Sequence, residues 1–125
     1  MNVPAELKYT SDHEWIRVEG DVITIGITDY AQGELGDVVF VELPEVGEEF
    51  AQADVAATIE AVKTVADVFL PVSGSIVAAN ESLDDDSELI NQDAYGAGWI
   101  LKVKMSDPSQ LDALMSAEDY IASIS

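Results

Sequence analysis

The sequence predicts a small, mainly β fold of antiparallel strands with a short internal helix and a helical C-terminus. A hydrophobic fraction of 48% over 125 residues is enough for one folded core. Between residues 13 and 105, turn signals separate apolar runs that have the length of strands. Beyond them the apolar residues follow helical spacing. We therefore expect one domain over residues 1–125, with a core of about residues 7–106 and a helical extension of about residues 108–124.

Local patterns predict the first elements. "HEWIRVEGDVITIGIT" predicts a hairpin with its turn at residues 19–21. Isoleucines alternate with Thr and Gly over residues 23–28, which is typical of a half-buried strand. In "TDYAQGELG", Thr28 or Asp29 can cap a short helix and Gly36 can end it.

Further strands follow in the middle of the chain. "DVVFVELPEVGEEF" predicts a strand closed by a turn, and "DVAATIEAV" and "VADVFLPV" predict two strands on either side of Lys63. "SGSIVAAN" and "GWILKVKM" predict two more. We expect "SLDDDSELIN" to be an acidic loop, because it lacks the spacing of a calcium-binding loop. Pro108 fits the first turn of a helix, and the residues after it indicate two short helices.

The charge pattern excludes several classes of partner. The chain has 5 Lys and Arg against 25 Asp and Glu, and its net charge of −20 repels nucleic acids and anionic lipids. We interpret the acid mainly as a feature for solubility and partner selection, with salt adaptation as a second explanation. The chain shows no apolar run of membrane-spanning length and no signal or transit segment, which predicts a cytoplasmic or already processed protein.

The residue types exclude several kinds of site. There is no cysteine, so disulfides, thiolate metal sites and a cysteine nucleophile are ruled out, and any redox chemistry must come from an added group. His13 is the only histidine, and a metal site or a catalytic triad would lack partners for it. We predict neither a metal site nor a catalytic residue, so a hydrolytic or metal enzyme is the class that the residues favour least.

Lys63 is the residue that suggests chemistry. "IEAVKTVAD" places it between two apolar strand runs, so we expect it at the tip of a hairpin. An exposed amine at such a tip can form an amide with a carboxylic acid cofactor, and the lysine stem then lengthens the cofactor into an arm. An ordinary exposed lysine in a turn explains the same spacing, and the residues alone leave both interpretations open.

Longer segments carry a resemblance to a known family. "YTSDHEWI", "GITDYAQGELGDVVFVELPEVG", "IEAVKTVADVFLPVSG" and "GWILKVK" together resemble the H-protein of the glycine cleavage system, from about residue 7 to about residue 120. The attachment motif of that family matches Glu60, Val62, Lys63, Asp67 and the turn that ends at Gly74. A lone Val-Lys-Thr would not be specific, whereas this set is.

The resemblance implies a lipoyl/biotinyl-domain-like sandwich, a barrel-sandwich hybrid, that carries lipoate on Lys63 and has no turnover of its own. A lipoate ligase or octanoyltransferase would attach the group, with Glu60, Val62, Asp67 and Gly74 serving in recognition. Three enzymes would then use the arm. They are the pyridoxal-phosphate glycine decarboxylase (P-protein), the tetrahydrofolate-dependent aminomethyltransferase (T-protein) and the dihydrolipoamide dehydrogenase (L-protein).

The resemblance also implies a cleft in which the loaded arm is protected from water. The aminomethyl cargo is cationic, so carboxylates are the expected lining. Our candidates are Asp12, Glu14 and Asp67, with His13 beside them. Ordinary surface acids explain Glu14 and Asp67 equally well.

Several alternatives remain at this point. One is an H-like protein that relays lipoate to other lipoyl proteins. A lipoyl domain of a 2-oxoacid dehydrogenase or a biotinyl domain is another, although Val62 and Thr64 replace the methionines that usually flank a biotinyl lysine. A non-carrier acidic adaptor module is the third, and it would keep its binding in a Lys63→Arg variant, whereas a carrier would lose its activity.

Overall fold

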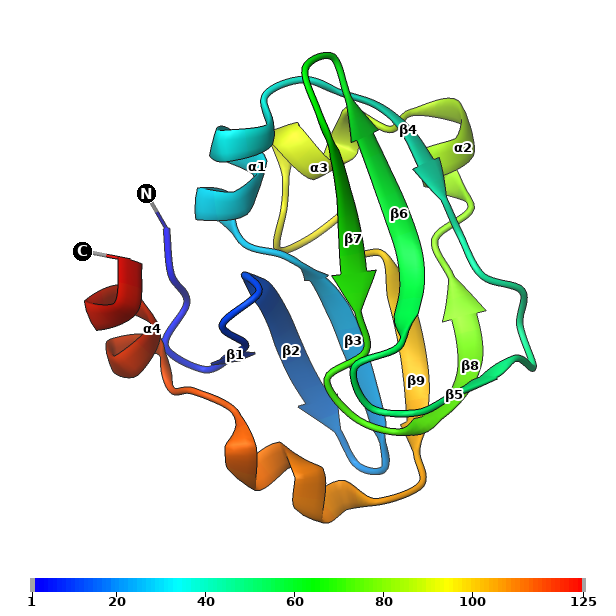
Figure 1. Cartoon of the computed structure of the whole chain (residues 1–125), viewed down its shortest axis with the longest axis vertical. Coiled ribbons are helices and arrows are strands. Elements are labelled where there is room, and N and C mark those ends of the chain that lie inside the picture. The colour runs from blue at the N-terminus through cyan, green and yellow to red at the C-terminus, as the bar shows by residue number, and fades with distance from the viewer. Residues whose placement is uncertain (1, 125) are drawn as a thin grey trace.

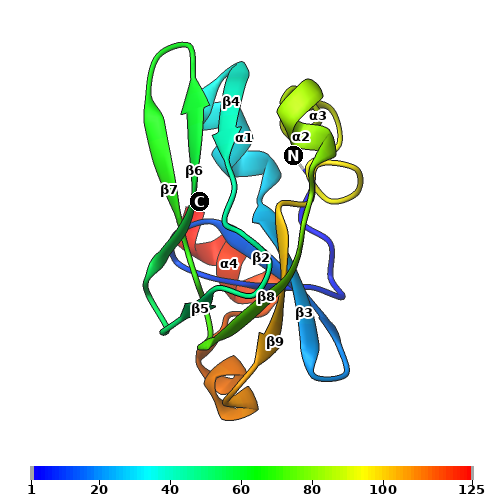
Figure 2. The same cartoon turned by 90° about the vertical axis from the view of Figure 1, so that its right-hand side faces the viewer.

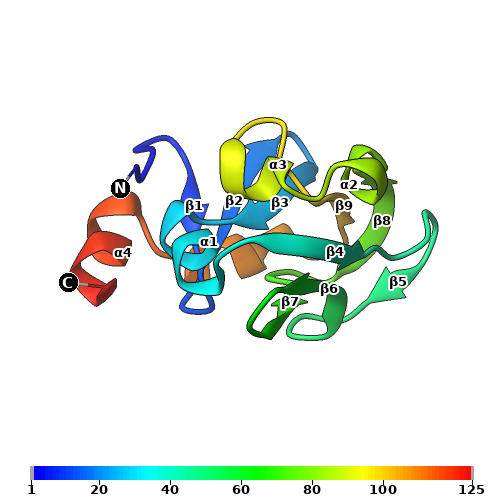
Figure 3. The same cartoon turned by 90° about the horizontal axis from the view of Figure 1, so that it is seen from above.

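Two antiparallel sheets face each other in the computed structural model, which describes residues 2–124 (Figures 1 and 3). The larger sheet has six strands. In spatial order they are β1 (Lys8–Tyr9), β2 (Glu14–Glu19), β3 (Val22–Ile27), β9 (Leu101–Met105), β8 (Gly74–Ala79) and β5 (Glu49–Phe50). The smaller sheet has three strands, in the order β4 (Val38–Glu42), β6 (Val55–Ala61) and β7 (Val65–Phe69). The mainly β, two-sheet fold predicted from the sequence is therefore confirmed.

The short helices lie around the two sheets (Figure 1). They are α1 (Asp29–Leu35), α2 (Ser82–Asp85), α3 (Leu89–Gln92), the 3₁₀ helix η1 (Pro108–Ala113) and α4 (Ala117–Ile124). The predicted caps of α1 are confirmed, because the Thr28 hydroxyl accepts from the Ala31 N–H and Gly36 follows the last residue. The two predicted C-terminal helices are present as η1 and α4. None of the helices described for residues 2–124 has the length and apolar character that a membrane span requires.

The expectation of an acidic loop at residues 82–91 was wrong. The segment forms α2 and α3, each with one buried apolar residue, Leu83 in α2 and Ile90 in α3. Burial of these two side chains against the main core holds the helical turns in place, although Asp and Ser have low helix propensity in isolation.

The core has two parts, and β2 and β3 separate them. The main part lies between the two sheets and includes Ile16, Ile25 and Ile59. The second lies on the other face of the large sheet, where α4 and the N-terminal segment cover Trp15 and Tyr9 (Figure 1). The strand β3 is consequently buried on both faces, not half-buried as its alternating pattern predicted.

Candidate functional site

Lys63 lies at the tip of the hairpin formed by β6 and β7. The hairpin rises beyond the ends of the neighbouring strands (Figures 1 and 2). The Ala61 N–H donates to the Thr64 carbonyl over 2.8 Å and closes the turn, while the Val62 N–H donates to the Asp37 carbonyl over 3.0 Å. The lysine is exposed and its amine has no hydrogen-bond partner among residues 2–124. The tip is thus held by its backbone, and the amine is free.

Gly36 leaves room for the lysine stem. A Cβ atom placed on Gly36 would lie 3.4 Å from Lys63 Cε and 4.0 Å from Nζ, so the stem runs over this glycine toward the end of α1. Gly36 also has a φ of +78°, a conformation that other L-residues adopt only with strain. The glycine therefore ends the helix, and the lysine stem packs over it at ordinary van der Waals distance.

A cleft of about 400 Å³ begins beside the hairpin, between α1, β7 and the loop before β2. Its apolar lining is suited to a hydrocarbon chain and its acidic lining to a cation. The structure brings three of the predicted residues together here, namely Asp12, His13 and Asp67. The other lining residues are Ile27, Tyr30, Ala31, Glu34, Leu35, Thr64 and Ala66.

His13 is fixed in this cleft by the C-terminal helix. Its Nδ1 atom lies 2.8 Å from the hydroxyl of Tyr120, which in turn lies 2.7 Å from the hydroxyl of Thr28. The imidazole ring also packs against the ring of Tyr30, with 4.9 Å between centroids. The backbone of His13 has a φ of +68°. These contacts hold the imidazole between α4 and the first turn of α1.

Glu14 is placed differently from the other predicted acids. It is 1% exposed and borders a second cavity of about 290 Å³, which shares Asp12 with the first. Its carboxylate accepts from the Phe69 N–H over 2.6 Å and from the Thr10 hydroxyl over 2.9 Å. Burial raises the pKa of Glu14 from 4.5 to about 7, although these two hydrogen bonds lower it. Glu14 therefore joins β2 to β7, the strand that carries Asp67, and does not line the cleft beside Lys63.

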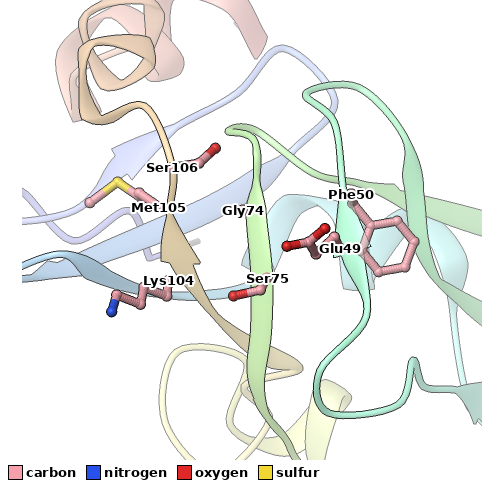
Figure 4. A pocket seen from close by; sticks show the side chains of 7 residues that line it. All are labelled: Glu49, Phe50, Gly74, Ser75, Lys104, Met105 and Ser106. Carbon is pink, nitrogen blue, oxygen red and sulfur yellow. The ribbon is translucent and has the colours of Figure 1, made fainter.

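The residues of the attachment motif divide into two places. Glu60 and Val62 are exposed next to Lys63, and Glu60 lies opposite Val65 in the hairpin. Gly74 starts β8 and lines a cavity at the other end of the molecule (Figure 4). The five-residue β7 strand separates it from the lysine by roughly 16 Å, at about 3.3 Å per residue. The motif is continuous in sequence but not in space.

Close packing explains the glycine at position 74. A Cβ atom there would lie 2.2 Å from the Lys104 carbonyl oxygen and 2.7 Å from Val103 Cγ1. Real atoms do not approach so closely, so the pairing of β8 with β9 requires a residue without a side chain.

Several residues that shape the cleft were not predicted. Gly36 was expected only as a helix end, and Glu34 and Thr64 were not expected to line a cavity. Tyr120 lies 107 residues from the His13 that it holds. The role of His13 follows from its positive φ and from its neighbours in space. No local sequence pattern shows either of these features.

An exposed lysine at the tip of a hairpin, in a two-sheet sandwich with a cleft within reach of its stem, defines a carrier domain for a lysine-linked cofactor arm. The family model described as glycine cleavage H-protein matches residues 7–125. The chain belongs to this family, as the resemblance implied.

Individual relatives agree with the family match. A glycine cleavage system H protein of Halothermothrix orenii is 56% identical over 120 residues, which cover 96% of this chain and 94% of that protein. The protein of the same name from Bacteroides thetaiotaomicron is 53% identical over 122 residues, covering 98% and 97% of the two chains. The crystal structure of a glycine cleavage system H protein from Mycobacterium marinum matches with a TM-score of 0.88 and 40% identity, over 96% of this chain and 97% of that chain.

Membership in the family establishes the role of the chain. It is a lipoyl carrier of the glycine cleavage system and a non-catalytic component of it. H-proteins carry lipoyl-lysine, and their partners are the P-, T- and L-proteins of the same system. The adaptor and the other carrier domains considered above are therefore set aside.

Proposed function

We propose that Lys63 is the lysine to which the lipoyl group is attached. The observation that supports this most directly is the free, exposed amine at the tip of a hairpin. The other three lysines, Lys8, Lys102 and Lys104, lie within β1 and β9 of the large sheet. An attaching enzyme can enclose a protruding tip far more readily than a side chain within a strand.

The residues around Lys63 fit a lipoyl arm. The stem lies over Gly36 at the end of α1, and the cleft beside the hairpin has a volume and an apolar wall that suit a short hydrocarbon chain. When bound, the lipoyl group supplies the disulfide and group-carrying chemistry that a chain without cysteine cannot supply itself. Attachment to the carrier also raises the local concentration of the arm at each bound enzyme.

The apolar and the acidic residues of the cleft have different roles. Ile27, Ala31 and Leu35 offer apolar surface to the arm, while Asp12 and Asp67 face a cationic cargo with carboxylates. Such a cargo is attracted to a site that carries opposite charge. We assign Glu14 a supporting part, because its bond to the Phe69 N–H fixes the strand that carries Asp67.

Glu60 and Val62 are the residues that we expect a lipoate ligase or octanoyltransferase to contact, since both are exposed beside the lysine. Gly74 lies too far from the tip for the same contact and contributes through the packing of β8. We also propose a cytoplasmic location, because the relatives described above are bacterial.

The exchange of glycine carboxyl carbon with bicarbonate, catalysed by P-protein, tests the assignment of Lys63. Lys63→Arg keeps the charge but cannot form the amide, so exchange should be lost while the fold is unchanged. Lys104→Arg is the matched control, since Lys104 is also exposed but lies in β9, and it should exchange like the wild type. Full exchange by Lys63→Arg would place the arm on another residue.

A further inference from the structure

A chain of hydrogen bonds runs from the first turn of α1 to His13. The Ala31 N–H donates to the Thr28 hydroxyl oxygen over 3.2 Å. This oxygen lies 2.7 Å from the Tyr120 hydroxyl, which lies 2.8 Å from His13 Nδ1. Thr28 and Tyr120 are both fully buried. Tyr120 is further fixed by its stacking on Tyr9, with 4.8 Å between ring centroids and 12° between the planes.

The protons in this chain have one consistent direction. The Thr28 hydroxyl oxygen accepts from the Ala31 N–H, and this N–H group cannot accept a proton in return. The single proton of the Thr28 hydroxyl can therefore be donated only to the Tyr120 oxygen. Tyr120 must then donate its own proton to His13 Nδ1, and Nδ1 acts as the acceptor. The opposite direction would leave the buried Thr28 proton without an acceptor, which is costly. His13 therefore carries its ring proton on Nε2.

The Nε2 atom is open to solvent. No hydrogen-bond partner exists for it among residues 2–124, yet every buried side-chain nitrogen and oxygen of the described chain has a partner. It follows that Nε2 is accessible, and the cleft is the cavity that His13 lines. The charged groups that share this lining are Asp12, Glu34 and Asp67, all of which are acceptors when ionised. His13 Nε2–H is thus a hydrogen-bond donor in a lining whose other charged groups are acceptors.

The position of His13 indicates which part of an arm it would meet. The stem of Lys63 lies over Gly36 at the end of α1, whereas His13 packs on Tyr30 in the first turn. Tyr30 and Gly36 are six residues apart, so the helix rises about 9 Å between these points, at 1.5 Å per residue. The lysine stem does not reach that far, but the sulfur-bearing end of a lipoyl arm does.

We propose that His13 Nε2–H is the hydrogen-bond donor that the cleft offers to the sulfur end of the arm, and that Tyr120 is a positioning residue that keeps His13 in this donor form. The inference rests on the proposed attachment at Lys63. The carboxylates Asp12 and Asp67 bind the cationic end of the cargo, and the imidazole N–H binds the sulfur beside it. The C-terminal helix thereby takes part in holding the arm.

Two variants separate the donor from its support. Tyr120→Phe removes the hydroxyl and keeps the stacking on Tyr9. His13→Asn suits the positive φ, and its amide oxygen can accept from Tyr120, but it offers no N–H at the Nε2 position. Tyr95→Phe is the matched control, because the Tyr95 hydroxyl contacts the start of α1 at the Asp29 N–H and does not contact His13.

The first readout is ¹⁵N NMR of the His13 ring in protein without the lipoyl group. The wild type and Tyr95→Phe should show the proton on Nε2, and Tyr120→Phe should shift the population toward Nδ1–H. The second is the rate at which isolated, loaded protein loses its aminomethyl group. We expect loss to be about fivefold faster in Tyr120→Phe and in His13→Asn, as for one lost hydrogen bond, and unchanged in Tyr95→Phe. The double variant should lose the group no faster than His13→Asn.

A wild-type imidazole with its proton on Nδ1 would overturn the inference directly. So would equal loss rates in all variants, provided that the wild type protects its cargo better than a small lipoamide does. If the intact mass shows no lipoyl group on Lys63, the proposed function fails and this inference fails with it. If Lys63 is lipoylated but the wild type gives no protection, only this inference fails. Thermal melting by circular dichroism shows whether each variant is folded before its rates are compared.

Discussion

Ionisation of Glu14 should make the stability of this protein fall as the pH rises. The carboxyl group is buried between β2 and β7 and its pKa is raised from 4.5 to about 7, mainly by burial and slightly by Asp12. The protonated form therefore stabilises the fold. This contribution is fully present below about pH 4.5 and is lost as the pH rises through about 7.

The size of the effect follows from the shift in pKa. One pKa unit corresponds to about 1.4 kcal/mol, so ionising Glu14 costs the fold about 3 kcal/mol in total. The isoelectric point is acidic, because 25 Asp and Glu outnumber 5 Lys and Arg. Near this pH the net charge approaches zero and the protein tends to precipitate, so measurements are made at higher pH. Between about pH 5.5 and about pH 8.5, roughly 2 kcal/mol of the effect remains measurable.

Urea unfolding followed by tryptophan fluorescence measures this effect in the wild type and in Glu14→Gln. Gln keeps an oxygen that accepts a hydrogen bond but does not ionise. The free energy of unfolding of the wild type, relative to Glu14→Gln, should fall by about 2 kcal/mol over this range. Glu19→Gln, at the exposed end of the same strand, is the control and should follow the wild type. Parallel curves for the wild type and Glu14→Gln would refute the reasoning.

Three other changes follow from the packing and the charge. Gly74→Ala should lower the free energy of unfolding by about 2 kcal/mol, because its Cβ meets the β9 backbone. Gly33→Ala is the comparison in the same urea assay. Its Cβ meets nothing on α1, so the higher helix propensity of Ala should raise the free energy of unfolding by about 1 kcal/mol. Gly36→Ala and Gly20→Ala, both at positive φ, should each cost about 1 kcal/mol. Neither should slow lipoylation, because a Cβ at Gly36 meets the Lys63 stem only at ordinary van der Waals distance and one at Gly20 meets nothing. Added NaCl should raise the melting temperature, because salt screens the repulsion among the acidic residues that give the net charge of −20. A melting temperature that does not change with salt would show that this repulsion is unimportant. It would also remove salt adaptation as an explanation for the many acidic residues.

The features that the sequence predicted correctly depend on local signals. The hairpin around Lys63 follows from two apolar runs separated by a short polar turn, and α1 follows from the caps at Thr28 and Gly36. The resemblance to H-proteins added the sandwich architecture, which hydrophobic periodicity and turn residues alone do not specify. Each of these features depends on residues that are neighbours in the chain.

The features that were not predicted depend on contacts distant in sequence. The second face of β3 is buried by side chains from outside the strand, such as the Trp15 ring against Gly26, so Thr24 is buried as well as the isoleucines. The helices at residues 82–92 form because Leu83 and Ile90 reach the core. Neither the strand pattern nor the composition of the acidic segment contains this information.

Spacing in the sequence also misled about the site. Gly74 follows Lys63 by eleven residues and was grouped with it in one motif, but an extended strand carries it to the other end of the molecule. His13 and Glu14 are adjacent in sequence, yet they line different cavities, because successive residues at the start of β2 point in different directions. Which acid lies beside the arm could be decided only from the structure.

The most direct test of the carrier function assigned to Lys63 is an intact mass measurement with peptide mapping. The protein is incubated with lipoate, ATP and a lipoate ligase, with the Mycobacterium marinum H protein as positive control for the ligase. We predict a gain of one lipoyl group on the peptide that contains Lys63, and no gain in Lys63→Arg. A lipoyl group on Lys8, Lys102 or Lys104, or no gain while the control is modified, would contradict the assignment.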